Sequence, residues 1–573
     1  MFWLGSAGNR LTEAVWARSM VRQIEAQIPL YKDRLCLLGI NLMMLSREKL
    51  VVPIITALTA LFLAGCGGPS AEQPADVEGL GTTIGSLVQV VQPGAVALEG
   101  YGLVGGLTGT GSIMAPPDVT AYLERYIKAQ MRDSGLDIEK LMRSRDTAVV
   151  RLEATLPEGA SKNQEFDVRV AALTGTRTTS LENGWLYTAD LRPVGTLGVA
   201  TATVAKAGGP VYIDKLGPGR VNRTAGYVLA GADVLKDYSV SLILSKPDFQ
   251  TASDIRNRIN EPFGPDVATA VTASQVELKV PNQYRKQQQW FLSVVQAMYL
   301  RQDPVLIARR IEAHIRELAV ADDKAAAEAA LEAIGHESLR ALPVLLNSSN
   351  EEVRLRAGRC MLKLDSERGL QVLRRIAEDR TSAYRVQALQ AIVLTAERDD
   401  AAAIARKLLR DDDFEIALAA YEELRRLNDI AIAQRLVGRR FYLEQIAQTP
   451  QKAIFVARRG QPRIVLFGAP LYCRDEVFVE SSDGSIMVNS AAGQKYVSVM
   501  RKHPARPALV GPLRTSFNLS DIIQVLCDEP LKERGERGGL GVSYADMVAL
   551  LQQMSAKGAV EAQFRAGPLP ETR

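Results

Sequence analysis

One segment of this chain can fold only as packed helices, and it divides the rest of the sequence in two. From about residue 322 to about residue 436 the sequence is rich in Ala, Leu, Arg and Glu, with apolar residues at helical spacing. A polar turn followed by an apolar helix start recurs there about every 30 residues, at 349–357, 380–388 and 411–418. Helices repeated at this period indicate a solenoid, whose units bury their apolar faces only against neighbouring units.

In the first repeat the turn precedes Val-Arg-Leu-Arg-Ala at 353–357, and this order resembles a HEAT repeat. The resemblance implies stacked helix pairs with an exposed concave surface, on which solenoids commonly bind a partner protein. A helical bundle with a chance periodicity is the alternative. We expect the HEAT-like helical repeats to cover residues 322–440, with connecting helices over 284–321.

The regions on either side of the helical segment mix strands and helices. The clearest predictions are strands at 147–156 and 166–173 and helices at 118–127, 251–259 and 543–557. Asn183-Gly184 and Asp483-Gly484 each lie between strand-like runs, which is a strong short signal for a hairpin. The predicted fold class is therefore α+β, with α+β and β-rich pieces at both ends, split by an all-α solenoid.

Composition supports a folded protein and argues against several function classes. Of the 573 residues, 47% are hydrophobic and 23% are charged, as in ordinary globular domains. Lys and Arg number 69 and Asp and Glu number 65, a formal charge of +4, which is too even to indicate a nucleic-acid partner. The three histidines, His314, His336 and His503, are far apart and show no metal-ligand spacing. We therefore expect no metal and no nucleic acid.

An export signal is predicted near the amino terminus. Residues 50–63 carry no charge, Arg47 and Lys49 stand just before them, and 63–66 read Leu-Ala-Gly-Cys. Such a basic start, short apolar run and small-residue cleavage point define a secretory signal, and the run is shorter than the roughly 20 apolar residues of a membrane-spanning helix. Leu-Ala-Gly-Cys resembles the lipobox of bacterial lipoproteins, which implies cleavage before Cys66 and lipidation of that residue. A buried apolar helix with a chance Cys is the alternative.

The signal divides the amino-terminal part of the chain. We expect residues 43–66 to be a lipoprotein signal peptide and residues 67–90 to be a flexible linker. A signal so far into a chain is unusual, so residues 1–42 are interpreted as a mis-assigned start or, alternatively, as a genuine extension. Gly67 is not the Asp that retains some lipoproteins at the inner membrane. By analogy, that favours a lipid anchor in the outer membrane.

The other cysteines are Cys36, Cys360, Cys473 and Cys527. Export would place the mature protein where disulfides are permitted. Cys473 and Cys527 lie in the same predicted region and could form a disulfide. Cys360 lies within a helical pattern and is expected to be part of the core.

Residues 100–105 spell Gly-x-Gly-x-x-Gly after a strand-like stretch, which is the pattern of a dinucleotide-binding loop. Such a site needs a helix that begins within the loop. Here more glycines follow, and Pro116 and Pro117 delay the next helix to Asp118. We expect a turn-rich loop, in which glycine permits a positive φ or a close backbone approach, and no cofactor. Nothing in the sequence assembles a nucleophile, a base and an oxyanion site, so we do not expect an enzyme.

The glycine-rich stretch at 99–112, EGYGLVGGLTGTGS, resembles the signature of the bacterial flagellar P-ring protein family, which is roughly G-Y-G-L-V-V-G-L-x-G-T-G-D. Gly105 stands where the family has Val, and Ser112 stands where it has Asp. Further stretches resemble family motifs in the same order, so the resemblance covers 91–283 and, more weakly, 441–573. The signature residues are Gly100, Tyr101, Gly102, Gly106, Gly109 and Gly111.

This resemblance implies a non-catalytic structural subunit that self-associates into a ring around the flagellar rod and contacts the rod and the outer ring. It implies a location in the periplasm, in the flagellar basal body. The helical repeats and the lipobox are departures from the family. They leave open an alternative, a lipid-anchored envelope scaffold that reuses the P-ring fold and binds a partner protein through its helical repeats.

Overall fold

The structure is a computed structural model of the chain, and it describes residues 79–571 except 93, 113, 115, 131–143, 197–201, 218, 238, 448, 503–508 and 531–537. The predicted extension, the signal peptide and the lipidated Cys66 lie outside the described residues. Among the helices that are described, none combines the length and the apolar character that crossing a lipid bilayer requires.

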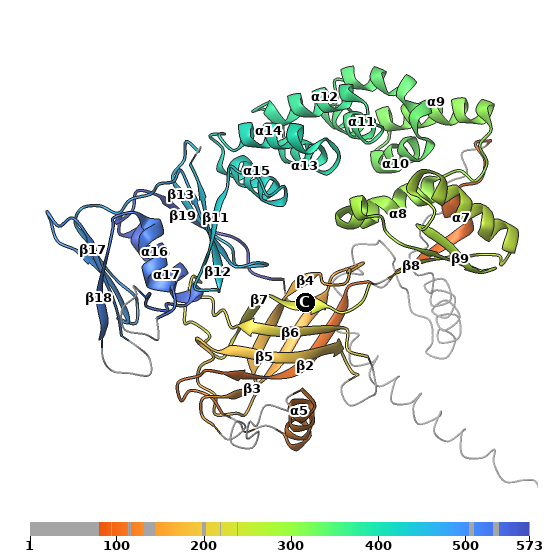
Figure 1. Ribbon diagram of the computed structural model, residues 1–573. Coiled ribbons are helices and arrows are strands. Elements are labelled where there is room, and N and C mark those ends of the chain that lie inside the picture. The colour runs from red at the N-terminus through yellow and green to blue at the C-terminus, as the bar shows by residue number, and fades with distance from the viewer. Residues whose placement is uncertain are drawn as a thin grey trace, which may run out of the picture. The chain divides into compact units, whose positions relative to one another are not determined.

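Six strands of the first mixed region close into an antiparallel barrel (Figure 1). In spatial order they are β2 (Val96–Gly105), β3 (Ala148–Leu156), β4 (Glu165–Ala172), β7 (Ala225–Val234), β6 (Ala205–Pro210) and β5 (Trp185–Pro193). Alternate residues point inward, as in β4, where Phe166, Val168 and Val170 are buried. Because closure gives each strand a partner on both sides, the barrel has no free sheet edge.

Helix α5 (Pro117–Gln130) packs on the outside of β2 and β3, where its residues Val119 and Leu123 join a cluster with Leu103 and Val149. This helix and the strands β3 and β4 lie where the sequence predicts them. The predicted hairpin at Asn183-Gly184 is wrong, because the residues before it form no strand. The strand that follows, β5, pairs instead with β2, which is distant in sequence, and with β6, the next strand along the chain.

The barrel is inserted into a smaller four-stranded sheet with the order β1 (Val88–Val91), β8 (Val240–Leu244), β10 (Gln275–Leu278) and β9 (Ala268–Thr272). Its helical elements are α4 (Ile84–Leu87), α7 (Phe249–Phe263), η3 (Asn282–Gln287) and α8 (Gln288–Ala297). Ile84 and Val88 are buried in the core of this sheet, together with Phe291 of α8. The linker predicted for 67–90 is therefore wrong at its carboxyl end, and the unit extends past the predicted boundary at residue 283.

A run of helices follows and separates the two β-rich regions, as predicted (Figure 1). They are α9 (Pro304–Val320), α10 (Lys324–Ile334), α11 (Glu351–Lys363), α12 (Glu367–Glu378), α13 (Arg385–Thr395), α14 (Arg398–Leu408) and α15 (Phe414–Arg426), with 3-10 turns η4 (His336–Arg340) and η5 (Leu342–Asn347) after α10. The predicted polar turns start helices, since Asn350 and Asp413 accept a hydrogen bond from the N–H groups of Glu352 and Glu415. The assignment of these helices as HEAT-like repeats stays a prediction.

Buried charged groups tie the helical run to the sheets at both ends. At the first end, Glu332 of α10 accepts a hydrogen bond from Trp290 Nε1 at 2.7 Å, and Lys363 Nζ lies 3.0 Å from the same carboxylate. At the second end, Glu444 of the following sheet has no exposed surface and accepts a hydrogen bond from Arg425 Nε at 2.9 Å. A buried carboxylate is tolerated when it is paired and hydrogen-bonded, so these contacts fix how the helices meet each sheet.

The last region contains two sheets with two helices in the core that they share. The five-stranded sheet has the order β11 (Ala433–Val437), β12 (Phe441–Ile446), β14 (Arg463–Phe467), β13 (Ala453–Val456) and β19 (Gln563–Ala566). The four-stranded sheet has the order β15 (Val477–Glu480), β16 (Ile486–Ser490), β17 (Val497–Lys502) and β18 (Leu509–Thr515). The two helices are α16 (Leu519–Cys527) and α17 (Tyr544–Ala556). Pairing of β15 with β16 confirms the hairpin predicted at Asp483-Gly484, and α17 confirms the helix predicted at 543–557.

The five-stranded sheet is covered on both faces. In its central strand β14, Ile464 and Leu466 belong to the core with α16 and α17. Val465 and Phe467 belong to the cluster formed with the last helices of the helical run. The sheet begins at Ala433, before the predicted boundary at residue 441, because β11 already pairs with β12.

Candidate functional site

The first signature residues lie inside a barrel strand. Gly100, Tyr101 and Gly102 belong to β2, which pairs with β3 along its length and with β5 near both ends. A Cβ at Gly100 would lie 2.4 Å from the carbonyl oxygen of Asp190, and one at Gly102 would lie 2.8 Å from Leu186 Cδ1. The predicted loop is therefore wrong here, although the close approach that motivated it is present.

The later signature residues shape the turn that leaves β2. Gly106 and Gly109 have φ angles of 75° and 76°, which glycine adopts without strain. A Cβ at Gly111 would lie 2.1 Å from the carbonyl oxygen of Thr147. Among the described residues of this stretch, no helix begins before Pro117, so they do not have the geometry of a dinucleotide-binding loop.

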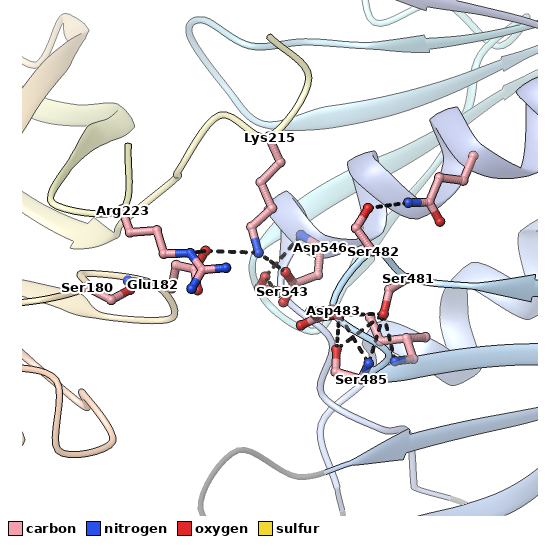
Figure 2. A network of polar contacts seen from close by, with 12 residues as sticks. Ser180, Glu182, Lys215, Arg223, Ser481, Ser482, Asp483, Ser485, Ser543 and Asp546 are labelled. Carbon is pink, nitrogen blue, oxygen red and sulfur yellow. Dashed lines mark hydrogen bonds and ion pairs between the residues drawn. The ribbon is translucent and has the colours of Figure 1, made fainter. Parts of the chain in front are cut away.

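The barrel also contacts the last region of the chain, at a set of residues that we call the joint. The joint comprises Asp167, Glu182, Tyr212, Asp214 and Lys215 on the barrel side and Arg458, Gly460, Tyr544 and Asp546 on the other side. At its centre Lys215 lies between two carboxylates (Figure 2). Its Nζ is 2.6 Å from Asp546 Oδ1 and 3.2 Å from Glu182 Oε1.

Local structure holds the two acidic partners of Lys215 in place. Ser543 is the N-cap of α17, and its hydroxyl accepts a hydrogen bond from the N–H of Asp546 and donates one to Asp546 Oδ2 at 2.7 Å. Arg223 Nε lies 3.6 Å from Glu182 Oε1 on the barrel side. Burial lowers the pKa of Lys215, but the carboxylates of Asp546 and Glu182 raise that pKa by more. Lys215 therefore remains a cation, which suits an ion pair and not a general base or a nucleophile.

Two further polar contacts of the joint involve the loop that contains Arg458 and Gly460. Arg458 Nη1 is 3.1 Å from Asp214 Oδ2. The carboxylate of Asp167 accepts a hydrogen bond from the N–H of Gly460 at 2.9 Å and another from the N–H of Ala230 at 2.7 Å. Ala230 has a φ of 47°, which is uncommon for a residue with a Cβ. Asp167 thus stabilises a strained position at the irregularity of strand β7 and binds the last region with the same side chain.

Aromatic rings fill the space between these polar contacts. The rings of Tyr212 and Tyr544 have centroids 5.7 Å apart, and those of Tyr544 and Phe441 are 5.1 Å apart. The Tyr544 hydroxyl donates to the carbonyl oxygens of Ala457 and Arg463, at 2.6 Å and 2.9 Å. Burial raises the pKa of Tyr544, so its hydroxyl stays neutral. The joint therefore combines apolar packing with hydrogen bonds and ion pairs, which together hold the two regions in contact.

A cleft of about 490 Å³ lies between the barrel wall and the residues near the end of the chain. Its charged side chains face one another, with Arg169 Nη1 2.6 Å from Glu153 Oε2 and Arg151 Nη2 3.5 Å from Glu99 Oε2. These pairs offer no nucleophile beside a base. Within the part of the chain that the structure describes, no three His, Cys, Asp or Glu residues are grouped so that they could hold a metal ion.

Cys473 and Cys527 are both buried and free in the structure. Burial raises the pKa of the Cys473 thiol to about 12 and raises that of Cys527 as well. The disulfide that the sequence allowed is therefore not formed here, because a shared region of sequence does not fix the close Cβ geometry that a disulfide needs. Cys360 is buried in the helical run, as expected.

Comparison with known proteins finds a family to which the first region of the chain is similar. Residues 83–311 match the family model described as flagellar P-ring protein. These residues are similar to the flagellar P-ring protein family. The P-ring match covers the small sheet, the inserted barrel and α8, and it ends within α9. It confirms the resemblance that the signature stretch carries, and it extends beyond the predicted 91–283 on both sides.

Individual P-ring proteins agree with this match. The chain is 31% identical over 220 residues to the flagellar P-ring protein of Thermotoga maritima, covering 36% of this chain and 63% of that protein. It is 30% identical over 220 residues to flagellar P-ring protein 1 of Photobacterium profundum, covering 36% and 57%. It is 31% identical over 247 residues to flagellar P-ring protein 1 of Vibrio parahaemolyticus, covering 40% and 62%. The chain thus spans about three fifths of the length of these curated relatives.

The joint connects the P-ring region to residues outside the match. The sequence did not single out Lys215, because it belongs to no motif, and it placed Asp167 only within a predicted strand. Ser543 and Asp546 were visible only as a helix start. The resemblance of residues 441–573 to the P-ring family stays a prediction.

Proposed function

We propose that this chain is a non-catalytic structural subunit of a periplasmic ring around the flagellar rod. The observation that carries the proposal is the P-ring match over residues 83–311. The matched residues fold into a closed barrel, and a side chain at Gly100 or Gly111 would collide with neighbouring backbone. The relatives are named for the same ring. We further propose that the subunit contacts its own copies, the rod and the outer ring.

The internal contacts support a role as a stiff bushing. A bushing must keep its shape against a moving rod, so its parts must be held by more than one contact. The barrel is held to the last region by the joint. The helical run is held at both ends by the buried carboxylates of Glu332 and Glu444. Against this background, we assign the helical run a second role, as a surface for a further partner protein.

We also propose that Cys66 carries a lipid that anchors the subunit to the outer membrane. The support is the uncharged run before it and the Leu-Ala-Gly-Cys sequence at 63–66. Cys66→Ala should release the protein from isolated membranes, while Ser70→Ala, four residues later, should leave it attached. A Cys66→Ala protein that stays in the membrane fraction would show that no lipid at this position anchors it.

The ring role is tested by localisation. A tag is fused at Arg573, basal bodies are purified from the native host, and labelled antibody against the tag is located by electron microscopy. Label on the ring around the distal rod is the expected result. Intact rings without label, with the tagged protein elsewhere in the envelope, would contradict the proposal. They would favour the lipid-anchored scaffold that binds a partner through its helical repeats.

A further inference from the structure

The two sheets of the last region end in four edge strands, β11 and β19 in one sheet and β15 and β18 in the other, and two of these edges, β11 and β15, carry complementary features. The strand β11 ends the five-stranded sheet and pairs only with β12. The strand β15 ends the four-stranded sheet and pairs only with β16. An edge strand presents a row of unpaired N–H and C=O groups, which can pair with a strand of another chain.

The strand β11 is exposed on both faces as well as along its edge. Residues 433–436 are all exposed, and the Leu436 side chain has 50% of its surface accessible. Ile430, just before the strand, is 91% exposed. Exposed large apolar side chains beside free backbone groups are what a protein normally avoids on an edge strand, unless the edge is a contact surface.

The two edges carry opposite charges. Arg435 lies in β11 and Arg439 in the turn after it, and both are exposed. Asp475 and Glu476 stand exposed immediately before β15, and Glu480 ends that strand. Among the described residues, Arg435, Arg439, Asp475 and Glu476 have no ion-pair partner. Each edge thus has free charge of one sign, and the signs are complementary.

Each edge also offers an exposed apolar side chain. Phe478 of β15 is 58% exposed, although Val477 and Val479 on either side of it are buried in the core. Leu436 is its counterpart on β11. An aromatic or aliphatic side chain surrounded by charged residues is the usual composition of the centre and rim of a protein contact.

We propose that β11 of one copy pairs with β15 of the next copy, so that the sheets of neighbouring subunits join edge to edge. The basic edge with Leu436 then meets the acidic edge with Phe478. Because the two edges are different surfaces, the contact is head to tail, and a head-to-tail contact closes into a ring when its rotation divides the full turn, and otherwise extends into a filament. Pairing of two β11 edges would bring like charges together, which disfavours it.

This inference rests on the proposed ring function and names a contact by which the subunits associate. Both edges lie outside the residues that match the P-ring family, 83–311, so the match itself assigns them no role. The contact therefore predicts that the last region, and not the matched region alone, determines assembly.

The test reverses the charge of each edge in the full chain, purified from membranes in mild detergent. One variant carries Arg435→Glu and Arg439→Glu, a second carries Asp475→Lys and Glu476→Lys, and a third carries all four substitutions. Sedimentation velocity and negative-stain microscopy measure assembly. Each single-edge variant should weaken association at least about tenfold, and the combined variant should restore it, because the charges are again complementary.

A control variant and two further measurements make the result specific. A control variant with Arg368→Glu and Arg375→Glu reverses two exposed arginines of α12 and should assemble like the parent. Hydrogen exchange of the amides at 433–437 should slow on assembly, because strand pairing protects amide N–H groups. Circular dichroism checks that each variant remains folded.

The outcomes separate the two proposals. Parent protein that assembles, with single-edge variants that assemble equally well, would overturn the edge pairing and leave the ring function standing. A combined variant that is folded but does not recover assembly would also overturn the edge pairing and leave the ring function standing. Parent protein that stays monomeric at every concentration would overturn both.

Discussion

The Nζ atom of Lys215 lies 2.6 Å from Oδ1 of Asp546, although 331 positions separate the two residues in the chain. Lys215 belongs to a barrel loop and Asp546 to the first turn of α17. The carboxyl half of the small sheet, the whole helical run and most of the last region lie between them in sequence. Their contact brings the last region back onto the matched region, so these two parts of the chain fold as neighbours.

Replacing Lys215 should weaken the joint. Lys215→Met leaves the carboxylates of Asp546 and Glu182 without their shared cation, and their side chains are only 15% and 22% exposed. We expect a loss of about 1–3 kcal/mol in the free energy of unfolding, since a mostly buried carboxylate loses its partner. Urea denaturation measures it. Arg223→Met, which removes a cation that is 59% exposed, is the control and should cost no more than about 0.5 kcal/mol. Equal effects would contradict a central role for Lys215.

The signature glycine in the barrel wall should not tolerate a side chain. In Gly100→Ala the new Cβ would lie 2.4 Å from the carbonyl oxygen of Asp190. Strands β2 and β5 would have to separate there, at a cost of about 1–3 kcal/mol. Gly208→Ala is the matched control, because its Cβ would find its nearest neighbour at 3.5 Å. Thermal unfolding compares the two variants. A Gly100→Ala protein as stable as Gly208→Ala would show that the close approach is not required.

The helical run should lose stability in acid. Burial raises the pKa of Asp411, but the Arg385 guanidinium, 2.5 Å away, and the N–H of Asp413 together lower it by more, so the pKa lies below its ordinary value of 3.8. Such a carboxylate stabilises the fold fully above its unfolded pKa, and this stabilisation disappears as the pH falls through the lowered pKa. Helical circular dichroism on heating should show the melting temperature falling below about pH 4.

The variant Asp411→Asn isolates this contribution. It removes the titrating group and leaves the Arg385 side chain, which is 6% exposed, without its anionic partner. We expect it to be less stable than the parent at pH 7 and to approach the parent as the pH falls, because the parent then loses the same ion pair. A stability difference that stays constant from pH 7 to about pH 3 would mean that Asp411 does not titrate as inferred.

The thiols of Cys473 and Cys527 should be unreactive in the folded protein and reactive once it unfolds. Both are buried, and burial raises both pKa values, so little thiolate is present near neutral pH. Iodoacetamide should label neither residue in native protein. Both should be labelled in denaturant without any reductant, as peptide mass spectrometry would show. Labelling in denaturant that appears only after reductant is added would instead demonstrate a disulfide.

Much of the architecture could be predicted because its causes are local. Apolar spacing determined α7 with its inward Ala252, Ile255 and Ile259, and the capping residue Ser543 with the apolar stripe after it determined α17. The period of the helical segment and the order of the P-ring motifs were likewise readable without a structure.

Only the tertiary structure decided what depends on residues far apart in the chain. Gly100 and Gly102 look like a loop until β5 is seen to close the barrel against them. The same holds for Lys215 and Asp546, which no local pattern could connect, since an ion pair depends on distance in space and not along the chain. The sequence alone therefore determined the central helical segment, several other helices, a few of the strands and the family that the first region resembles. The barrel closure, the joint and the free sheet edges of the last region were determined by how those elements pack.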